Sequence, residues 1–473
     1  MSDHCALVVK NRMIDWGPRP FKTFDVWLKD RGFKELVKKA WDVSVHSGNS
    51  LERVKNKLKG LKKELKQWRD DVFNSEKVKK QQSIEEIEAI DHCDDDGSLQ
   101  EDLRVRRIQL LSDLRVMSER ENAMIKQKSR VEWIEKGDMN SKFFHSKLRW
   151  RRLNNEIKGL QTNGVWCEEP DRVKSEVRKF FDTRFEAQPK LGVNLDGVSF
   201  STISAVDNDM LCSMFSEPKI LAAISQCGST KSLGPDGFNF NFIKNNWDII
   251  GANMISVIYS FYESGYIPKG CNASFITLVP KRDNLSTLNE YRPISLVGCV
   301  YKVISKLLVN RLKRVLPNVI DKNQTAFLSG KSLLDSVLVA NETVDFLKKE
   351  KQKGVIVKVD YEKAYDSVDS DFLVYMLRRL GFKDKWIKWI KACLTSATIS
   401  VLVNGSPTKE FRLKRRLRQD DPLAPFLFLI ATEGLAGLVK EASRIGVLEG
   451  VRVGYNCVDV KLLQFADDTL FFC

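Results

Sequence analysis

The sequence has few of the residues that build a zinc site or a disulfide framework. It contains four histidines, and its ten cysteines are scattered singly from Cys5 to Cys473 without a Cys-x-x-Cys pair. This spacing predicts reduced thiols and no zinc. His92 and Cys93 stand next to the acidic run 94–96, but this pattern is more typical of a solvated acidic turn than of a metal site.

Long apolar runs are also missing. No stretch reaches the length of a membrane span, and the N-terminus lacks the apolar core of a secretory signal. The sequence therefore predicts an intracellular protein, in the nucleus or the cytoplasm, that is not secreted and has no membrane partner. With 473 residues, of which 43% are hydrophobic, the chain can fill more than one core, so we expect two or three domains.

Acidic residues are outnumbered by basic ones. The 77 Lys and Arg residues against 62 Asp and Glu residues give a formal net charge of +15. This excess favours a polyanionic partner, because contacts from Lys and Arg to phosphates supply most of the non-specific affinity for nucleic acids.

Apolar residues in the N-terminal third recur at helical spacing. From Leu51 to Val72 they follow steps of three and four residues, which predicts a helix with a heptad seam. After the acidic turn that ends at Gly97, a second apolar series from Leu99 to Met117 predicts a return helix. Residues 51 to about 130 are therefore expected to form an antiparallel helical hairpin.

Aromatic and basic residues alternate just beyond this hairpin, from Trp133 through Phe143 and Phe144 to Arg152. Such a pattern can stack bases and hold phosphates. It is equally typical of an amphipathic helix with a solvated face, and the sequence leaves both interpretations open.

Two apolar runs in the C-terminal part end in carboxylates. Residues 354–360 and 462–472 both predict buried strands, and the second is interrupted by Ala466-Asp467-Asp468, as in a hairpin with acids at its tip. Carboxylates gathered in an apolar frame repel one another unless cations lie between them. Hard oxygen ligands suit Mg²⁺, and two such ions about 3.5–4 Å apart support in-line phosphoryl displacement. This pattern indicates nucleotidyl transfer.

Three motifs in this part carry a family resemblance. Residues 360–368 read Asp-Tyr-Glu-Lys-Ala-Tyr-Asp-Ser-Val, 417–428 begin Leu-Arg-Gln-Asp-Asp-Pro, and 465–468 read Phe-Ala-Asp-Asp. Together they resemble the palm motifs of reverse transcriptases, in particular those of plant LINE-type, non-LTR retrotransposons. The resemblance implies an α+β fold, in which a helical N-terminal region precedes right-hand polymerase fingers and a partial palm, an antiparallel sheet flanked by helices, with the thumb absent.

The same resemblance implies a division into domains. Residues 1–15 are similar to the last motif of the endonuclease that precedes the polymerase in these elements. Residues 16–205 would form a mostly helical linker, 206–353 the fingers, and 354–473 a truncated palm.

Site residues are implied residue by residue. Asp360 and Asp467 would be the principal ligands of two Mg²⁺ ions, with Asp468 as the auxiliary acid. The nucleotide would be bound by five residues: Lys281 and Arg292 on its triphosphate, Tyr361, Tyr365 excluding a 2′-hydroxyl, and Gln419 bordering the pocket. The substrates implied are an RNA template, a DNA primer and deoxynucleoside triphosphates. The primer's 3′-hydroxyl is the nucleophile, so positioning and electrostatics carry the catalysis.

Further basic and amide side chains are candidates for nucleic-acid contacts. Gln324 and Lys331 are candidate template contacts. Asn404-Gly405 predicts a hairpin turn. The strand that returns after it carries a basic edge that includes Arg412, Arg418 and the run 414–416, and this edge could track a nucleic-acid backbone.

The sequence departs from the family pattern at two glycines and at its end. Asp420 stands where family members usually have glycine, and a glycine is also usual near Arg416. The chain stops at Cys473, inside the strand that leaves Asp468. These breaks predict a weak or inactive enzyme. The alternatives are a non-catalytic RNA-binding module derived from the element, or a protein similar to group II intron maturases.

Overall fold

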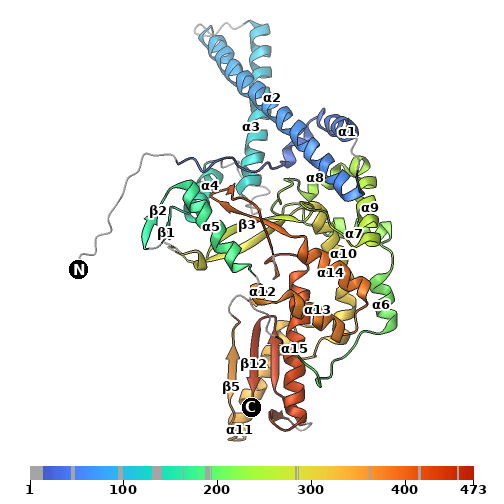
Figure 1. The fold of residues 1–473 in the computed structure, drawn as a ribbon. Coiled ribbons are helices and arrows are strands. Elements are labelled where there is room, and N and C mark those ends of the chain that lie inside the picture. Colours follow the sequence, from blue (N-terminus) through green and yellow to red (C-terminus); the bar gives the residue numbers. More distant parts are fainter. Residues whose placement is uncertain are drawn as a thin grey trace, which may run out of the picture.

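The computed structural model describes residues 14–473, with the exception of short segments. The segments left out are 44–47, 94–99, 130–140, 163, 187–191, 193, 283–284, 286, 362–363, 414–416 and 455–456. The fold is α+β, as predicted: a long helical projection, a body of helices around a mixed sheet, and a second, smaller sheet (Figure 1). The endonuclease-like segment 1–15 falls almost entirely outside the described residues.

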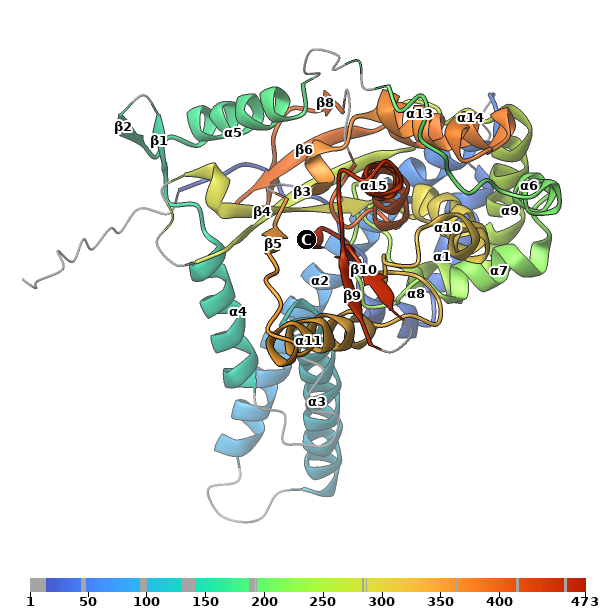
Figure 2. The ribbon, with the colours of Figure 1, turned by 90° about the horizontal axis from the view of Figure 1, so that it is seen from below.

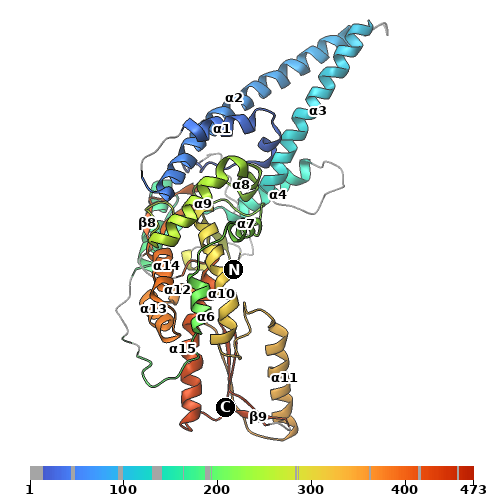
Figure 3. The ribbon, with the colours of Figure 1, turned by 90° about the vertical axis from the view of Figure 1, so that its right-hand side faces the viewer.

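The helical hairpin projects from the body as α2 (Ser50–His92) and α3 (Glu101–Ser129) (Figure 3). Asn49 caps α2 by accepting a hydrogen bond from the Glu52 N–H at 2.9 Å. The apolar seam has two partners. Its first half, from Val54 to Leu65, is buried in the main core with α1 (Phe33–Val43) and α9 (Trp247–Ser264), and only its later part runs along α3. The periodicity predicted the helix but could not show this change of partner.

The larger sheet has the order β4 (Tyr291–Val297), β3 (Ala273–Pro280), β6 (Thr398–Val403), β7 (Ser406–Pro407), and β8 (Phe411–Arg412) also pairs with β6. The β3–β4 pair is antiparallel and the β3–β6 pair is parallel. Asn404 and Gly405, both with positive φ, form the tight turn between β6 and β7 that their sequence predicted. One face packs on α5 (Pro170–Arg184), whereas residues on the other face of β3 and β4 stay partly accessible.

The smaller sheet has the order β11 (Leu462–Phe465), β12 (Asp468–Phe472), β5 (Ile356–Val359), and all its pairs are antiparallel. It packs between α11 (Leu333–Lys349) and α15 (Ala424–Arg444). The predicted burial of the first strand is wrong: Ile356 and Val357 are 42% and 45% exposed. The reason is that β5 is the edge strand. It has a neighbouring strand on one side only, so fewer side chains cover its apolar residues.

The remaining elements complete the body and its margins. The helices η1, α6, α7, α8, α10, α13 and α14 lie around the main core, and Figure 2 shows α4 on the other side of the molecule from α6 and α7. Their bounds are η1 Asp25–Lys29, α4 Ser141–Asn155, β1 Leu160–Thr162, β2 Val165–Cys167, α6 Ala205–Cys212, α7 Glu217–Ser225, α8 Phe240–Asn245, η2 Leu288–Glu290, α10 Cys299–Val319, α12 Ala364–Ser367, α13 Ser370–Arg379, α14 Asp384–Thr395, β9 Val451–Val453 and β10 Val458–Val460. Within the described part of the chain, no helix combines the length and the apolar character that a membrane span needs.

Candidate active site

The three predicted carboxylates lie at one end of the smaller sheet. Strand β12 pairs with β5 in a register that sets Thr469 opposite Val359. The same register, continued by one residue, sets Asp468 beside Asp360. Asp467 lies in the turn between β11 and β12, because Phe465 pairs with Asp468. Residues more than 100 positions apart in the sequence are thus neighbours at the end of this sheet.

The donor set at this end fits a divalent cation by its chemistry. Asp360 and Asp468 are exposed and Asp467 is half-buried, so all three can present carboxylate oxygens, which are the ligands that Mg²⁺ prefers. Among the residues that the structure describes, however, no group of three acidic, histidine or cysteine side chains forms a ready-made metal cluster. Lys358 Nζ lies 3.5 Å from Asp468 Oδ1, but both side chains are largely exposed, so this pair adds little rigidity.

The turn that carries Asp467 is held by Gln324. Ala466 has a φ of 56°, and Gln324 Oε1 accepts a hydrogen bond from its N–H at 3.0 Å while Gln324 Nε2 donates to its carbonyl at 3.4 Å. Two backbone bonds reinforce the contact: Thr325 N–H donates to the Gln464 carbonyl at 3.0 Å, and Gln464 N–H donates to the Asn323 carbonyl at 2.9 Å. The turn geometry is therefore fixed from outside its own hairpin.

The prediction of a template contact is wrong for Gln324, and Lys331 is only partly exposed. Gln324 is 1% exposed, so its amide is fully engaged with backbone. Lys331 Nζ donates to the carbonyls of Lys322 and Gln324 at 2.8 and 3.1 Å. Both side chains brace the segment under the acidic turn, a role that no sequence signal revealed.

Tyr365 links this end of the sheet to the second motif. It lies in the short helix α12, its ring is 5.0 Å from that of Phe428, and its carbonyl accepts a hydrogen bond from Leu417 N–H at 3.3 Å. Burial raises the pKa of the Tyr365 hydroxyl, and the negative charges of Asp467 and Asp420 raise it further. Burial also raises the pKa of Tyr361, which lies beside Thr469. The two tyrosines therefore border the acidic turn.

Gln419 and Asp420 lie on a loop tied to the larger sheet. Ser295 N–H on β4 donates to the Gln419 carbonyl at 3.1 Å, and Gln419 Oε1 is buried without a hydrogen-bond partner in the described part of the molecule. Buried acceptors normally have a hydrogen-bond partner. Because the Gln419 amide oxygen has none in the described part of the molecule, it can accept a hydrogen bond from a ligand. Asp420 has a φ of 65°. Desolvation raises the pKa of its carboxyl, and Lys231 opposes that shift.

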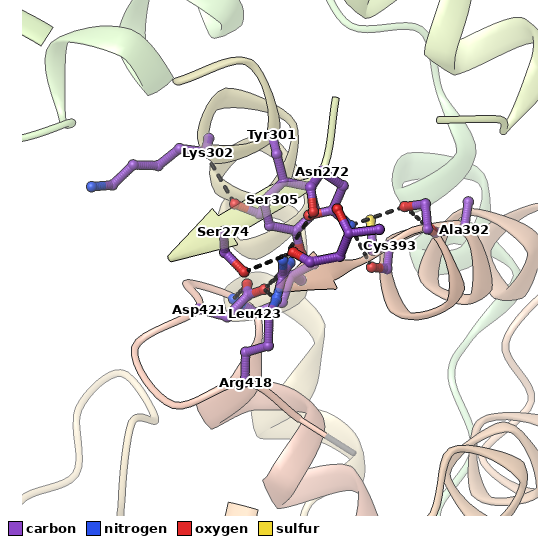
Figure 4. Close-up of polar contacts among 12 residues, drawn as sticks. Asn272, Ser274, Tyr301, Lys302, Ser305, Ala392, Cys393, Arg418, Asp421 and Leu423 are labelled. Atoms are coloured by element: carbon purple, nitrogen blue, oxygen red, sulfur yellow. Dashed lines mark hydrogen bonds and ion pairs between the residues drawn. The ribbon is translucent and has the colours of Figure 1, made fainter. Parts of the chain in front are cut away.

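Beneath this loop lies a buried charged network (Figure 4). Arg418 donates to Asp421 Oδ2 from Nε at 3.0 Å and from a terminal nitrogen at 2.6 Å. The Tyr301 hydroxyl donates to the same oxygen at 2.8 Å, and Asp421 Oδ1 accepts the Leu423 N–H at 3.0 Å. Arg418 also lies over the Tyr301 ring, 4.5 Å from its centroid. The network joins the loop to α10, on which Tyr301 lies.

The predicted basic edge is therefore wrong for Arg418, which is 4% exposed. This burial could not be predicted, because the paired acid Asp421 stands three positions away in a stretch whose composition is also typical of the surface. Residues 414–416 of the same edge, with the position near Arg416 where glycine is usual, lie outside the described residues.

Lys281 and Arg292 lie together on the β3–β4 hairpin. The register pairs Val279 with Arg292, and Lys281 follows the last paired residue of β3. Both side chains are exposed. Because Ser295 on β4 is bonded to Gln419, this hairpin adjoins the loop that carries Gln419 and Asp420. Backbone hydrogen bonds thus link the β3–β4 hairpin to Gln419 through Ser295, and the start of the Gln419 loop to Tyr365 through Leu417.

Comparisons with known proteins match the part of the chain that carries this site. Residues 279–473 match the family model described as reverse transcriptase (RNA-dependent DNA polymerase). This region is thus similar to reverse transcriptase domains. The chain is 25% identical over 380 residues to the Transposon TX1 149 kDa protein of Xenopus laevis, covering 79% of the chain and 28% of that protein.

Two further relatives extend the comparison. The chain is 28% identical over 208 residues to the Pol polyprotein of the retrotransposable element R2 of Popillia japonica, covering 44% of the chain and 28% of that protein. A mitochondrial protein of Arabidopsis thaliana is 46% identical over 68 residues, covering 14% of the chain and 56% of that protein. The first two relatives are thus proteins of a transposon and of a retrotransposable element, and the chain spans 28% of the length of each.

Proposed function

We propose that this chain catalyses RNA-directed DNA synthesis and that, as it stands, it does so weakly. The observation that carries the proposal is the placement of the acids. Asp360 and Asp468 are neighbours in a continued antiparallel register, and Asp467 lies in the turn that Gln324 holds. Three carboxylates in such an arrangement can hold the metal ions of a nucleotidyl transferase.

The residues of this chain would divide the work as follows. Asp360, Asp467 and Asp468 hold two Mg²⁺ ions, which when bound activate the primer's 3′-hydroxyl and neutralise charge on the transferred phosphate. Lys281 and Arg292 bind the triphosphate, the first as a point charge and the second as a planar fork. Tyr365 lies under the sugar and excludes a 2′-hydroxyl. Gln419 and Tyr361 border the same pocket.

The wider assignments form part of the same proposal. Residues 206–353 are the fingers and 354–473 the palm, with a helical linker over 16–205 and an endonuclease remnant over 1–15. The template is RNA, the primer is DNA, and the protein works in the nucleus or the cytoplasm. The matching motifs and the similarity to an Arabidopsis protein support an origin in a plant LINE-type element.

A primer-extension assay tests the proposal. The full chain, given an RNA template annealed to a DNA primer, Mg²⁺ and deoxynucleoside triphosphates, should extend the primer slowly. It should use ribonucleoside triphosphates much less well, because of Tyr365. Absence of extension at high enzyme concentration, with the chain folded by circular dichroism, would overturn the catalytic assignment.

The backbone at Asp420 leads to a further prediction. A side chain in left-handed conformation costs about 1–2 kcal/mol at most residues, and this one also brings a negative charge toward a polyphosphate. Asp420→Gly should therefore raise the extension rate about fivefold or more, if roughly 1 kcal/mol of repulsion is removed. It should also raise the midpoint of thermal unfolding.

Two control variants separate the causes of that effect. Asp420→Asn removes the charge but keeps the side chain, so it isolates the electrostatic part. Lys351→Gly relieves another left-handed residue, with a φ of 52°. Lys351 precedes β5, at the opposite end of that strand from Asp360, so this variant should leave the extension rate unchanged. A slower Asp420→Gly enzyme would show that Asp420 contributes to the site.

A second candidate function is a non-catalytic RNA-binding module. The charged residue at position 420, held in a conformation that favours glycine, is the observation that favours it, because it opposes binding of a nucleotide. Filter binding decides between the two: RNA affinity that ignores Mg²⁺, nucleotide and the Asp360→Ala substitution, together with no extension by Asp420→Gly, indicates the module. The maturase alternative predicts the same catalytic acids and is separated by the template that the enzyme prefers.

A further inference from the structure

Helix α4 has an unusual balance of charge. Its fifteen residues, Ser141 to Asn155, include five lysines and arginines and no aspartate or glutamate. Arg149, Arg151 and Arg152 are all exposed. A solvated face on an ordinary surface helix mixes both signs, as α2 and α3 do with their ion pairs Arg106–Glu86 and Arg107–Asp91. The one-signed charge of α4 indicates an anionic partner.

The two sides of α4 differ in burial. Phe144 is 8% exposed and faces the body, where α4 packs against α3 and β3, and Arg151 donates to the Ser129 carbonyl. On another face, Trp150 and Leu153 are 57% and 55% exposed. The interpretation as an amphipathic helix with a solvated face is therefore confirmed, because one face anchors the helix and the other stays accessible.

The accessible face alternates aromatic rings with a cation. Phe143, Lys147 and Trp150 follow at helical spacing, and Lys147 Nζ lies 6.0 Å from the Phe143 ring centroid and 5.3 Å from the Trp150 ring centroid. The indole thus makes a cation–π contact while more than half of the Trp150 residue stays exposed. An exposed indole among cations suits a ligand that offers both a flat ring and a phosphate.

The location of α4 connects this face to the proposed active site. The helix packs against β3, the strand that leads directly into Lys281. A nucleic-acid strand on α4 would therefore lie on the same sheet that presents the candidate triphosphate residues. Duplex RNA buries its bases in the stack, so an indole can reach a base only in a single strand.

We propose that the outer face of α4, formed by Phe143, Lys147, Trp150 and Leu153 with Arg149 at its edge, binds single-stranded RNA, one base stacking on Trp150. This inference deepens the proposed function, because the strand would be the unpaired template. It rests on that function only for the strand's identity, since the binding itself needs no catalysis.

Fluorescence anisotropy with a labelled 20-nucleotide single-stranded RNA tests the proposal on the full chain. Stacking on an aromatic residue contributes about 1–3 kcal/mol per base, so Trp150→Ala should weaken binding about 5- to 150-fold, whereas Trp150→Phe should retain most of it. The matched control is Trp166→Ala, because Trp166 is 47% exposed on β2 and should not affect binding. Equal unfolding midpoints of the variants establish that the fold is intact.

The salt dependence of binding provides a second measurement. Lys147→Ala should lower the slope of log affinity against log salt by about 0.7, the value for one phosphate contact on a single strand, and Lys219→Ala on α7 should leave it unchanged. Asp467→Asn should bind the RNA as the unmodified chain does, so a failure of catalysis is distinguishable from a failure of this site. Wild-type affinity in Trp150→Ala, or equal competition by polyglutamate, would overturn the proposal and indicate an acidic protein partner or a generic anion surface.

Discussion

Replacing Asp467 with Asn should reduce primer extension at least about 100-fold, because a metal ion at a phosphoryl-transfer site contributes several kcal/mol to the transition state. The amide keeps the size of the side chain and can still accept a hydrogen bond, but it removes the negative charge. The Ala466 hydrogen bonds to Gln324 do not involve the Asp467 side chain, so the turn should keep its shape. Single-turnover extension under saturating nucleotide measures the effect on the chemical step.

Asp384→Asn is the matched control, since Asp384 is an exposed carboxylate in the first turn of α14 and should not affect the rate. Asp360→Asn should resemble Asp467→Asn, because both would hold the same ions, and the double variant should lose little more than either single one. An Asp467→Asn enzyme within a few-fold of the unmodified rate would contradict the assignment of the acids.

Replacing Asp421 with Ala should destabilise the fold by about 3–5 kcal/mol, the usual cost of leaving one partner of a buried ion pair without its counter-charge. Arg418 is 4% exposed and has two hydrogen bonds to Asp421, so the guanidinium cannot reach water without opening the loop. The Tyr301 hydroxyl would lose its acceptor as well. The midpoint of urea unfolding, followed by circular dichroism, measures the loss.

The double variant Arg418→Met with Asp421→Leu should recover much of that stability, because it removes both buried charges together. Loss of one partner from the exposed pair Arg444–Glu441 in Arg444→Ala should change the midpoint little. If Asp421→Ala unfolds at the same urea concentration as the unmodified chain, the network does not hold the loop. A stable double variant that fails to extend primers would show that the network positions Gln419 rather than only stabilising the fold.

Residue patterns over short stretches predicted one helix and two tight turns correctly. The seam from Leu51 predicted α2, the pair Asn404-Gly405 predicted the β6–β7 turn, and Ala466-Asp467 predicted a hairpin tip. Burial was harder to predict, because it depends on which strands and helices pack against a residue in the folded protein. The β-branched residues Ile356 and Val357 predicted a strand correctly but a buried one wrongly, since nothing in the run tells an edge strand from a central one.

Side-chain roles were hardest to predict where charge and burial conflict. Arg418 sits in a run of cations and reads as surface, yet it is paired with Asp421 inside the body. Gln324 was predicted to contact the template, yet its side-chain amide is hydrogen-bonded to the backbone N–H and carbonyl of Ala466. Both errors have the same origin: the partner that decides the environment of the side chain is set by tertiary structure, which spacing along the sequence does not encode.

The hydrogen bonds between Gln324 and Ala466 affect how segments of the chain can be exchanged between related proteins. The proposed border between fingers and palm lies at residue 353, but the acidic turn beyond it is shaped by an amide from before it. A chimera that takes residues 354–473 from a related protein receives the aspartates without the Gln324 that supports their turn. Transplanting residues 321–326 along with them should preserve the turn. A functional exchange therefore has to include both partners of the hydrogen bonds between Gln324 and Ala466, on either side of residue 353.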